Sequence, residues 1–225
     1  MSTALPSEFA DEWRQTGTRR ERGSIMVLSV VAETTLYEHR ETATAMDDVD
    51  TTLSPRSLYR IDLEIHPPLS ALGVTPEGVF SMAAGKAKGR FISMIESEGL
   101  LIDGERKVVS FDRGDGVAGK WYVFESRYPL ATETSENAGN SSDSSSDTPG
   151  TGGENSLADG ITTETHLAIW PAGNSYAMAG GTFPLEAPPG LESTFQVDPN
   201  ADRETIAAFV RAMAEPTLEP EDDQQ

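Results

Sequence analysis

Two short stretches of the chain place a carboxylate and an imidazole two residues apart: Glu64 with His66, and Glu164 with His166. Residues two apart on a β-strand share one face, so each stretch could present both groups together. Two such strands side by side could hold a zinc or manganese ion. A metal-dependent hydrolase is therefore one candidate function. Polar alternation in a Glu-rich chain also produces these residues by chance, and the metal site requires the two strands to be neighbours.

The sequence GNSYA at residues 173–177 is close to the G-x-S-x-G nucleophile elbow, in which a strand-to-helix turn exposes a serine. Here the serine is followed by AMAGGTF, which is typical of a strand. The histidine of such hydrolases also follows the serine in the chain, whereas the last histidine of this chain is His166. A hairpin turn is the better interpretation.

The sequence AAGKAKGR at residues 83–90 suggests a phosphate-binding loop. It lacks both the first glycine and the hydroxyl residue of a Walker A motif, because Phe80 and Ala87 stand at those positions. Lys86, Lys88 and Arg90 are better explained as the solvated face of a helix. A weak anion-binding patch is the alternative.

Two tripeptide motifs have no expected role. Arg113-Gly114-Asp115 is the triplet that integrins bind, but between two apolar runs it predicts a hairpin turn. Asn140-Ser141-Ser142 is an N-glycosylation acceptor by pattern, and it would matter only in an exported protein.

The chain is strongly acidic, with a formal net charge of -20 from 37 acidic and 17 basic residues. Lysine occurs only at positions 86, 88, 107 and 120, and the other basic residues are arginine. Surplus carboxylates with scarce lysine resemble the haloarchaeal style of protein, in which molar salt screens self-repulsion. The charge argues against nucleic-acid binding and against anionic membrane surfaces.

The location of the protein is expected to be cytoplasmic. The chain has no cysteine, which excludes disulfides and thiolate metal sites. Arg19 and Arg20 precede an apolar run, as in a twin-arginine export signal, but the run spans only residues 25–32, with Ser29 within it, and it favours a buried strand. No window reaches the length of a membrane span. An exported, surface-associated protein is the alternative.

Periodicity along the chain predicts an α+β fold with an antiparallel sheet of about six strands, covered by a long helix and a C-terminal helix. The clearest strand is residues 57–66, which alternates until Pro67 and Pro68. The long helix is expected to begin at Thr75 and Pro76 and to end at Gly99. The other expected elements are a short helix at 7–15, strands at 24–38, 106–112, 117–128, 162–170 and 176–183, and a helix at 200–214.

A serine-rich stretch raises the question of domain number. Residues 137–156 read NAGNSSDSSSDTPGTGGENS and contain no strongly apolar side chain. Only a hairpin and one helix follow it, too little for an independent core. We therefore predict one domain over residues 24–214 with a disordered loop inserted at 131–159, whose flanking strands pair. Residues 1–23 are expected to be a flexible segment, and residues 215–225 an acidic disordered tail.

The order of elements resembles the PsbP/Mog1/DcrB-like group of α-β-α sandwiches over residues 24–214. The resemblance rests on topology, with the strand sequence GVAGKWYVFESRY and the hairpin HLAIWPAGNSYAMAGG as its recognisable parts. It implies an accessory, assembly or binding role and supplies no functional residues. The sequence thus predicts a non-catalytic binding or assembly module with a protein partner and no cofactor, and it leaves the oligomeric state open.

Overall fold

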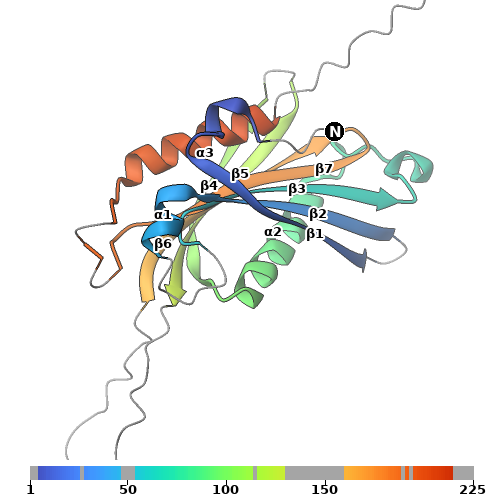
Figure 1. Cartoon of the computed structure of the whole chain (residues 1–225). Helices are drawn as coiled ribbons and strands as arrows, with labels where there is room; N and C mark the ends of the chain where they lie inside the picture. Colours follow the sequence, from blue (N-terminus) through green and yellow to red (C-terminus); the bar gives the residue numbers. More distant parts are fainter. Residues whose placement is uncertain are drawn as a thin grey trace, which may run out of the picture.

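The computed structural model describes residues 5–25, 28–46, 54–113, 116–129, 160–188, 191–192 and 195–214. Within them, seven strands form one antiparallel sheet in the order β1-β2-β3-β7-β6-β5-β4 (Figure 1). The strands are β1 (Trp13–Ile25), β2 (Leu28–His39), β3 (Ser57–His66), β4 (Leu101–Asp112), β5 (Ala118–Pro129), β6 (Gly160–Ala172) and β7 (Ser175–Pro184). The helices are α1 (Arg40–Ala45), α2 (Phe80–Ser97) and α3 (Pro199–Ala214), with 3-10 turns η1 (Ser7–Phe9) and η2 (Leu69–Leu72).

The two longer helices lie on opposite sides of the sheet, α3 above it and α2 below it in Figure 1. Alternate residues of each strand point to opposite faces, so every central strand contributes to both cores. On β6, for example, Trp170 packs with the α3 core and Ile169 with the α2 core. We call these two sides of the sheet the α3 face and the α2 face.

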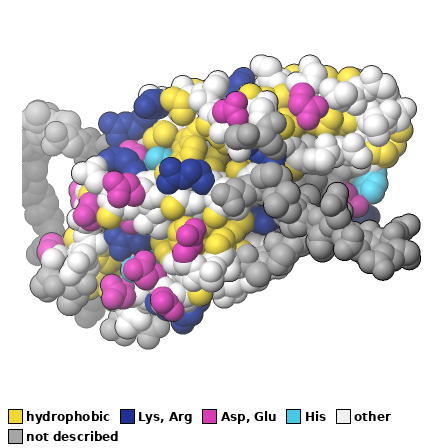
Figure 2. Space-filling model, turned by 90° about the horizontal axis from the view of Figure 1, so that it is seen from above, with side chains coloured by type: hydrophobic (Ala, Val, Ile, Leu, Met, Phe, Trp, Pro, Cys, Tyr) yellow, Lys and Arg dark blue, Asp and Glu magenta, His cyan; other side chains and the backbone are white. Residues whose placement is uncertain are grey.

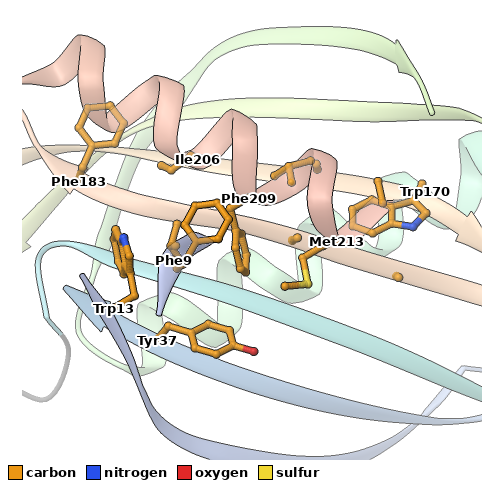
Figure 3. Packing of buried hydrophobic residues seen from close by; sticks show 14 residues of the cluster. Phe9, Trp13, Tyr37, Trp170, Phe183, Ile206, Phe209 and Met213 are labelled. Carbon is orange, nitrogen blue, oxygen red and sulfur yellow. The ribbon is translucent and has the colours of Figure 1, made fainter. Parts of the chain in front are cut away.

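The core of the α3 face is built around Phe209, which is fully buried. Ile206, Phe209 and Met213 recur at three- and four-residue steps and point from α3 toward the sheet (Figure 3). Phe9 of η1 and Tyr37 of β2 meet the Phe209 ring edge to face, at centroid distances of 5.6 and 5.8 Å. Aromatic packing therefore fastens the N-terminal turn to the C-terminal helix.

The core of the α2 face is formed by one stripe of the helix. Ala84, Phe91 and Ile95 are its buried residues. They pack with tyrosines and phenylalanines of the sheet, and the rings of Phe91 and Tyr59 lie 5.0 Å apart. This confirms the amphipathic periodicity that predicted the helix.

Two consecutive glycines of β7 bring the layers close together. A Cβ added to Gly180 would lie 1.9 Å from the carbonyl oxygen of His166 and 2.7 Å from the Tyr59 hydroxyl, which donates a hydrogen bond to that carbonyl. A Cβ on Gly181 would lie 3.0 Å from Ile206 of α3. Since β7 is central, only glycine fits beneath these side chains.

The sheet has seven strands rather than six, because β1 occupies part of the segment predicted to be flexible. Its sequence, WRQTGTRRERGSI, shows no alternation of apolar and polar residues. β1 lies at the edge of the sheet, and most of its side chains on both faces are exposed. A strand whose two faces are both exposed to solvent shows no alternation of apolar and polar residues, and β1 was therefore not predicted from the sequence.

Several predicted boundaries also shift. β4 begins at Leu101 rather than at residue 106, and α1 occupies part of the polar connection before β3. The long helix begins at Phe80, because Thr75 caps a preceding turn, in which its hydroxyl accepts a hydrogen bond from the Gly78 amide. β3 and α3 fall within a residue of their predicted bounds.

The strands that flank the serine-rich stretch are paired. β5 and β6 form an antiparallel ladder from Lys120 with Ile169 to Pro129 with Gly160. β6 and β7 are central in the sheet, so the part of the chain after the stretch completes the layer begun before it. The predicted loop at 131–159 and the predicted tail at 215–225 lie outside the described residues.

Candidate functional site

The two Glu/His pairs do not meet. β7 lies between β3 and β6, so the two strands are not neighbours. His166 pairs with Gly181, and Gly181 pairs with Leu58, which lies about 20 Å from Glu64 along β3. The prediction that the two pairs share a metal ion is therefore wrong. Within the described residues, no group of three or more His, Asp or Glu side chains is arranged to hold a metal ion.

The Glu64–His66 pair lies on the surface of the protein. Nε2 of His66 lies 2.8 Å from Glu64, and Arg20 of β1 lies 3.2 Å from the same carboxylate. Each of these three side chains is more than half exposed. Such contacts contribute little stability because water screens them.

The second pair, in which both residues are buried, belongs to a polar chain that links α3, β6 and β5. Oε1 of Glu164 accepts hydrogen bonds from His166 Nε2 at 2.7 Å and from Arg203 Nε at 2.7 Å. Oε2 accepts from Arg203 Nη2 at 2.9 Å. His166 Nδ1 accepts from the indole N–H of Trp121 at 3.0 Å. We call Arg203, Glu164, His166 and Trp121 the polar chain.

The indole fixes the tautomer of His166. An indole nitrogen can only donate, so the Nδ1 atom that faces Trp121 carries a lone pair and the ring proton is on Nε2. In a catalytic triad, the carboxylate orients the imidazole so that its other nitrogen can activate a hydroxyl. In this protein the other nitrogen, Nδ1 of His166, accepts a hydrogen bond from the indole N–H of Trp121, which cannot become a nucleophile.

Glu164 is a buried carboxylate that keeps its charge. Burial alone would raise its pKa, but hydrogen bonds from His166 and Arg203 and the charge of Arg203 outweigh this and lower the pKa to about 2. Bidentate pairing with a guanidinium is the geometry that stabilises a buried carboxylate most strongly. The polar chain therefore contains a buried, ionised carboxylate paired with Arg203 of α3.

Replacing Trp121 with phenylalanine should keep the ring packing but remove the donor to His166. We expect a loss of about 1–2 kcal/mol in unfolding free energy, because a buried acceptor loses its partner. Nitrogen NMR shifts of the His166 ring provide the second measurement. A wild-type ring protonated on Nδ1 would contradict the proposed tautomer.

The polar chain positions Trp121 beside the edge of the sheet. Trp121 pairs directly with Val109 of β4, and both lie on the α3 face. Phe111 contacts the Trp121 ring edge to face at 6.1 Å. We call Val109, Phe111 and Trp121 the β4 strip. Figure 2 shows this side of the molecule, where hydrophobic side chains lie among dispersed acidic and basic ones.

β4 is an edge strand with two unlike halves. The first half carries two register irregularities, between Ile102 and Gly104 and between Glu105 and Lys107, and it is rich in charge. The second half, residues 107–112, pairs with β5 without interruption. Val108 and Val109 are 45% and 37% exposed, one on each face of the sheet. Bulges and charges protect the first half from pairing with another chain, whereas the second half is open to it.

The opposite edge of the sheet is better protected. β1 has an irregularity between Gln15 and Gly17 and carries arginines on both faces. Arg14 is paired with Glu38, and Arg19 with Glu98. A charged, bulged edge disfavours the addition of a further strand. Of the two edges, β4 is the one suited to binding.

Where the structure describes them, residues of the remaining motifs have structural roles. GNSYA forms the tight β6–β7 hairpin, in which Ala172 pairs with Ser175 and Gly173 has a φ of 57°. Ser175 thus begins a strand and does not sit on a strand-to-helix elbow. Lys88 of the proposed anion patch is paired with Glu105 and lies over the Tyr122 ring. Arg113 donates to the Pro171 carbonyl, and Asn140 lies outside the described residues.

Four buried hydroxyls form a second polar cluster, on the α2 face. Ser126 lies 2.7 Å from the Thr163 hydroxyl and 2.8 Å from that of Thr165, which lies 3.0 Å from that of Thr182. Every member has a hydroxyl partner, so the cluster is internally satisfied. It ties together β5, β6 and β7.

The sequence pattern identified Glu164 and His166 but did not identify Arg203 or the β4 strip, which includes Trp121. The exposed Val108-Val109 pair was the only signal, since it interrupts the alternation expected of a strand with one wet face.

Comparison with known proteins gives no relative from which to transfer a role: no family model matches the chain, and no curated protein or solved structure matches it significantly. None of the described helices is long and apolar enough to cross a membrane.

Proposed function

We propose that the protein is a non-catalytic binding or assembly module that takes up an extended segment of a partner protein at β4. The observation that carries this proposal is the regular, unprotected half of β4 with its two exposed valines. A strand added to a sheet edge gains main-chain hydrogen bonds, and side chains beside the edge give selectivity. Trp121, held in place by the polar chain, supplies the apolar surface beside this edge.

The chemistry of the polar chain supports a positioning role over a catalytic one. The carboxylate of Glu164 is engaged by Arg203 and His166, and the second nitrogen of His166 by Trp121. Each group that could transfer a proton is therefore committed to another side chain. The placing of α2 and α3 on opposite faces is also the layering that a PsbP/Mog1/DcrB-like sandwich implies, and the members of that group act mainly in accessory and assembly roles.

We also propose a halophilic archaeal source and a cytoplasmic location. The net charge of -20 and the four lysines support the first. For the second, Arg19 and Arg20 pair with Thr34 and Glu33 of β2, so cleavage after them would remove part of a strand. The absence of cysteine is compatible with this location.

Replacing Val109 with lysine should weaken partner capture by about tenfold, since a charge on an edge strand opposes strand addition. The measurement is affinity capture from native lysate in molar KCl, with captured proteins quantified by mass spectrometry. Met82→Lys is the matched control, because Met82 is 63% exposed but lies on α2, on the opposite face of the sheet from Val109. If both variants capture the same proteins as the wild type, β4 is not the binding site.

A further inference from the structure

We propose that the strand taken up at β4 is β4 of a second copy of the chain, in a two-fold arrangement centred on Val109. This inference rests on the proposed role of β4 in strand addition and names the partner. It would join two seven-stranded sheets edge to edge. A symmetric pair is also the commonest solution for a self-complementary surface.

Symmetry restricts the possible registers. A two-fold axis perpendicular to the sheet makes the two β4 strands antiparallel and keeps both α3 faces on one side. Residues that oppose each other then lie on the same face, so the residue on the axis faces its own copy. Within the regular half of β4, the central candidates are Val108, Val109 and Ser110.

The side chains favour the register centred on Val109. Val109 then faces its copy, and Trp121 flanks it on both sides, which gives an unbroken apolar row across the junction. On the other face Val108 opposes Ser110, and in the next row Lys107 opposes Phe111. Like charges never oppose each other in residues 107–111.

The two alternative registers are less favourable. Centring on Ser110 brings Val108 opposite Asp112, which sets an apolar side chain against a carboxylate. Centring on Val108 brings Val109 opposite Lys107 and interrupts the apolar row. Charge and apolar complementarity therefore select the same register.

Salt should control this association. Two copies that each carry a charge of -20 repel one another at low ionic strength. The Debye length falls from about 10 Å at 0.1 M salt to about 3 Å at 1 M, so molar KCl removes most of that repulsion. Light scattering should accordingly show monomers in dilute salt and dimers in molar KCl.

Single cysteines provide a test of register, because the natural chain contains none. In molar KCl under mild oxidation, Val109→Cys should form a disulfide-linked dimer at least about fivefold more than Val108→Cys or Ser110→Cys. Directly opposed residues lie within disulfide reach, whereas diagonal ones are about 7–8 Å apart. Met82→Cys, exposed on α2, measures random collision.

Each outcome is decisive. Preferential cross-linking at residue 109, with a dimer by light scattering, supports the inference, and a maximum at residue 108 or 110 overturns the register. A monomer at every KCl concentration, with no cross-link above the Met82→Cys level, overturns the second copy as partner. In that case the strand-addition role is still judged separately, by whether Val109→Lys loses the other proteins that the wild type captures.

Discussion

Replacing Gly180 with alanine should destabilise the fold by about 3 kcal/mol or more, at the upper end of what overpacking of a core costs. The added Cβ would lie 1.9 Å from the carbonyl oxygen of His166, which belongs to the neighbouring strand β6. That oxygen cannot move away without separating β6 from β7 at the centre of the sheet. The added Cβ would also displace the Tyr59 hydroxyl from its hydrogen bond to this carbonyl. Urea unfolding at fixed KCl concentration measures the effect.

Gly23→Ala is the matched control for this prediction. Gly23 also lies in a strand, but nothing lies within 4 Å of a Cβ added there. Its substitution should change the unfolding free energy by no more than about 0.5 kcal/mol. Equal stabilities of the two variants would show that β7 does not lie as close to β6 and Tyr59 as described.

How well the sequence predicted each element depended on how that element is buried. β3 and α3 were predicted closely because α3 buries one stripe of side chains, and β3 after Tyr59 is more exposed on one face than on the other, so burial imposes a period on the residues. The edge strands β1 and β4 are wet on both faces, so their residues follow no period, and the sequence missed or shortened them. One of these edge strands, β4, is also the surface where binding is proposed.

The candidate site was predictable only in part, because its members come from distant parts of the chain. Glu164 and His166 lie two residues apart on the same face of β6, and their spacing revealed the pair. Arg203 lies 39 residues from Glu164, and Trp121 lies 45 residues from His166. Only the strand order brings them together, and the same order, with β7 between β3 and β6, separates Glu64 from Glu164.

Replacing Glu164 with glutamine should be the most damaging change to the polar chain. The amide keeps the shape of the side chain but loses the charge that Arg203 engages, and its NH₂ group cannot accept a hydrogen bond. Breaking a buried ion pair on one side costs about 3–5 kcal/mol, and the partial exposure of Arg203 places the expected loss near about 3. Urea unfolding of the variant near pH 7 and fixed KCl measures this loss.

The pH dependence provides an independent measurement of the same carboxylate. Because the pKa of Glu164 falls to about 2 from an ordinary 4.5, its stabilisation is complete above pH 4.5 and is lost as the pH falls through 2. The wild type should lose about 2–3 kcal/mol more than Glu164→Gln over this interval. Glu64→Gln is the control, since Glu64 forms the same kind of pair with His66 but is 54% exposed, and it should follow the wild type within about 0.5 kcal/mol. If Glu164→Gln also follows the wild type at every pH, then the carboxylate is not held ionised by Arg203 and His166. The polar chain would then not be what fixes Trp121 beside β4.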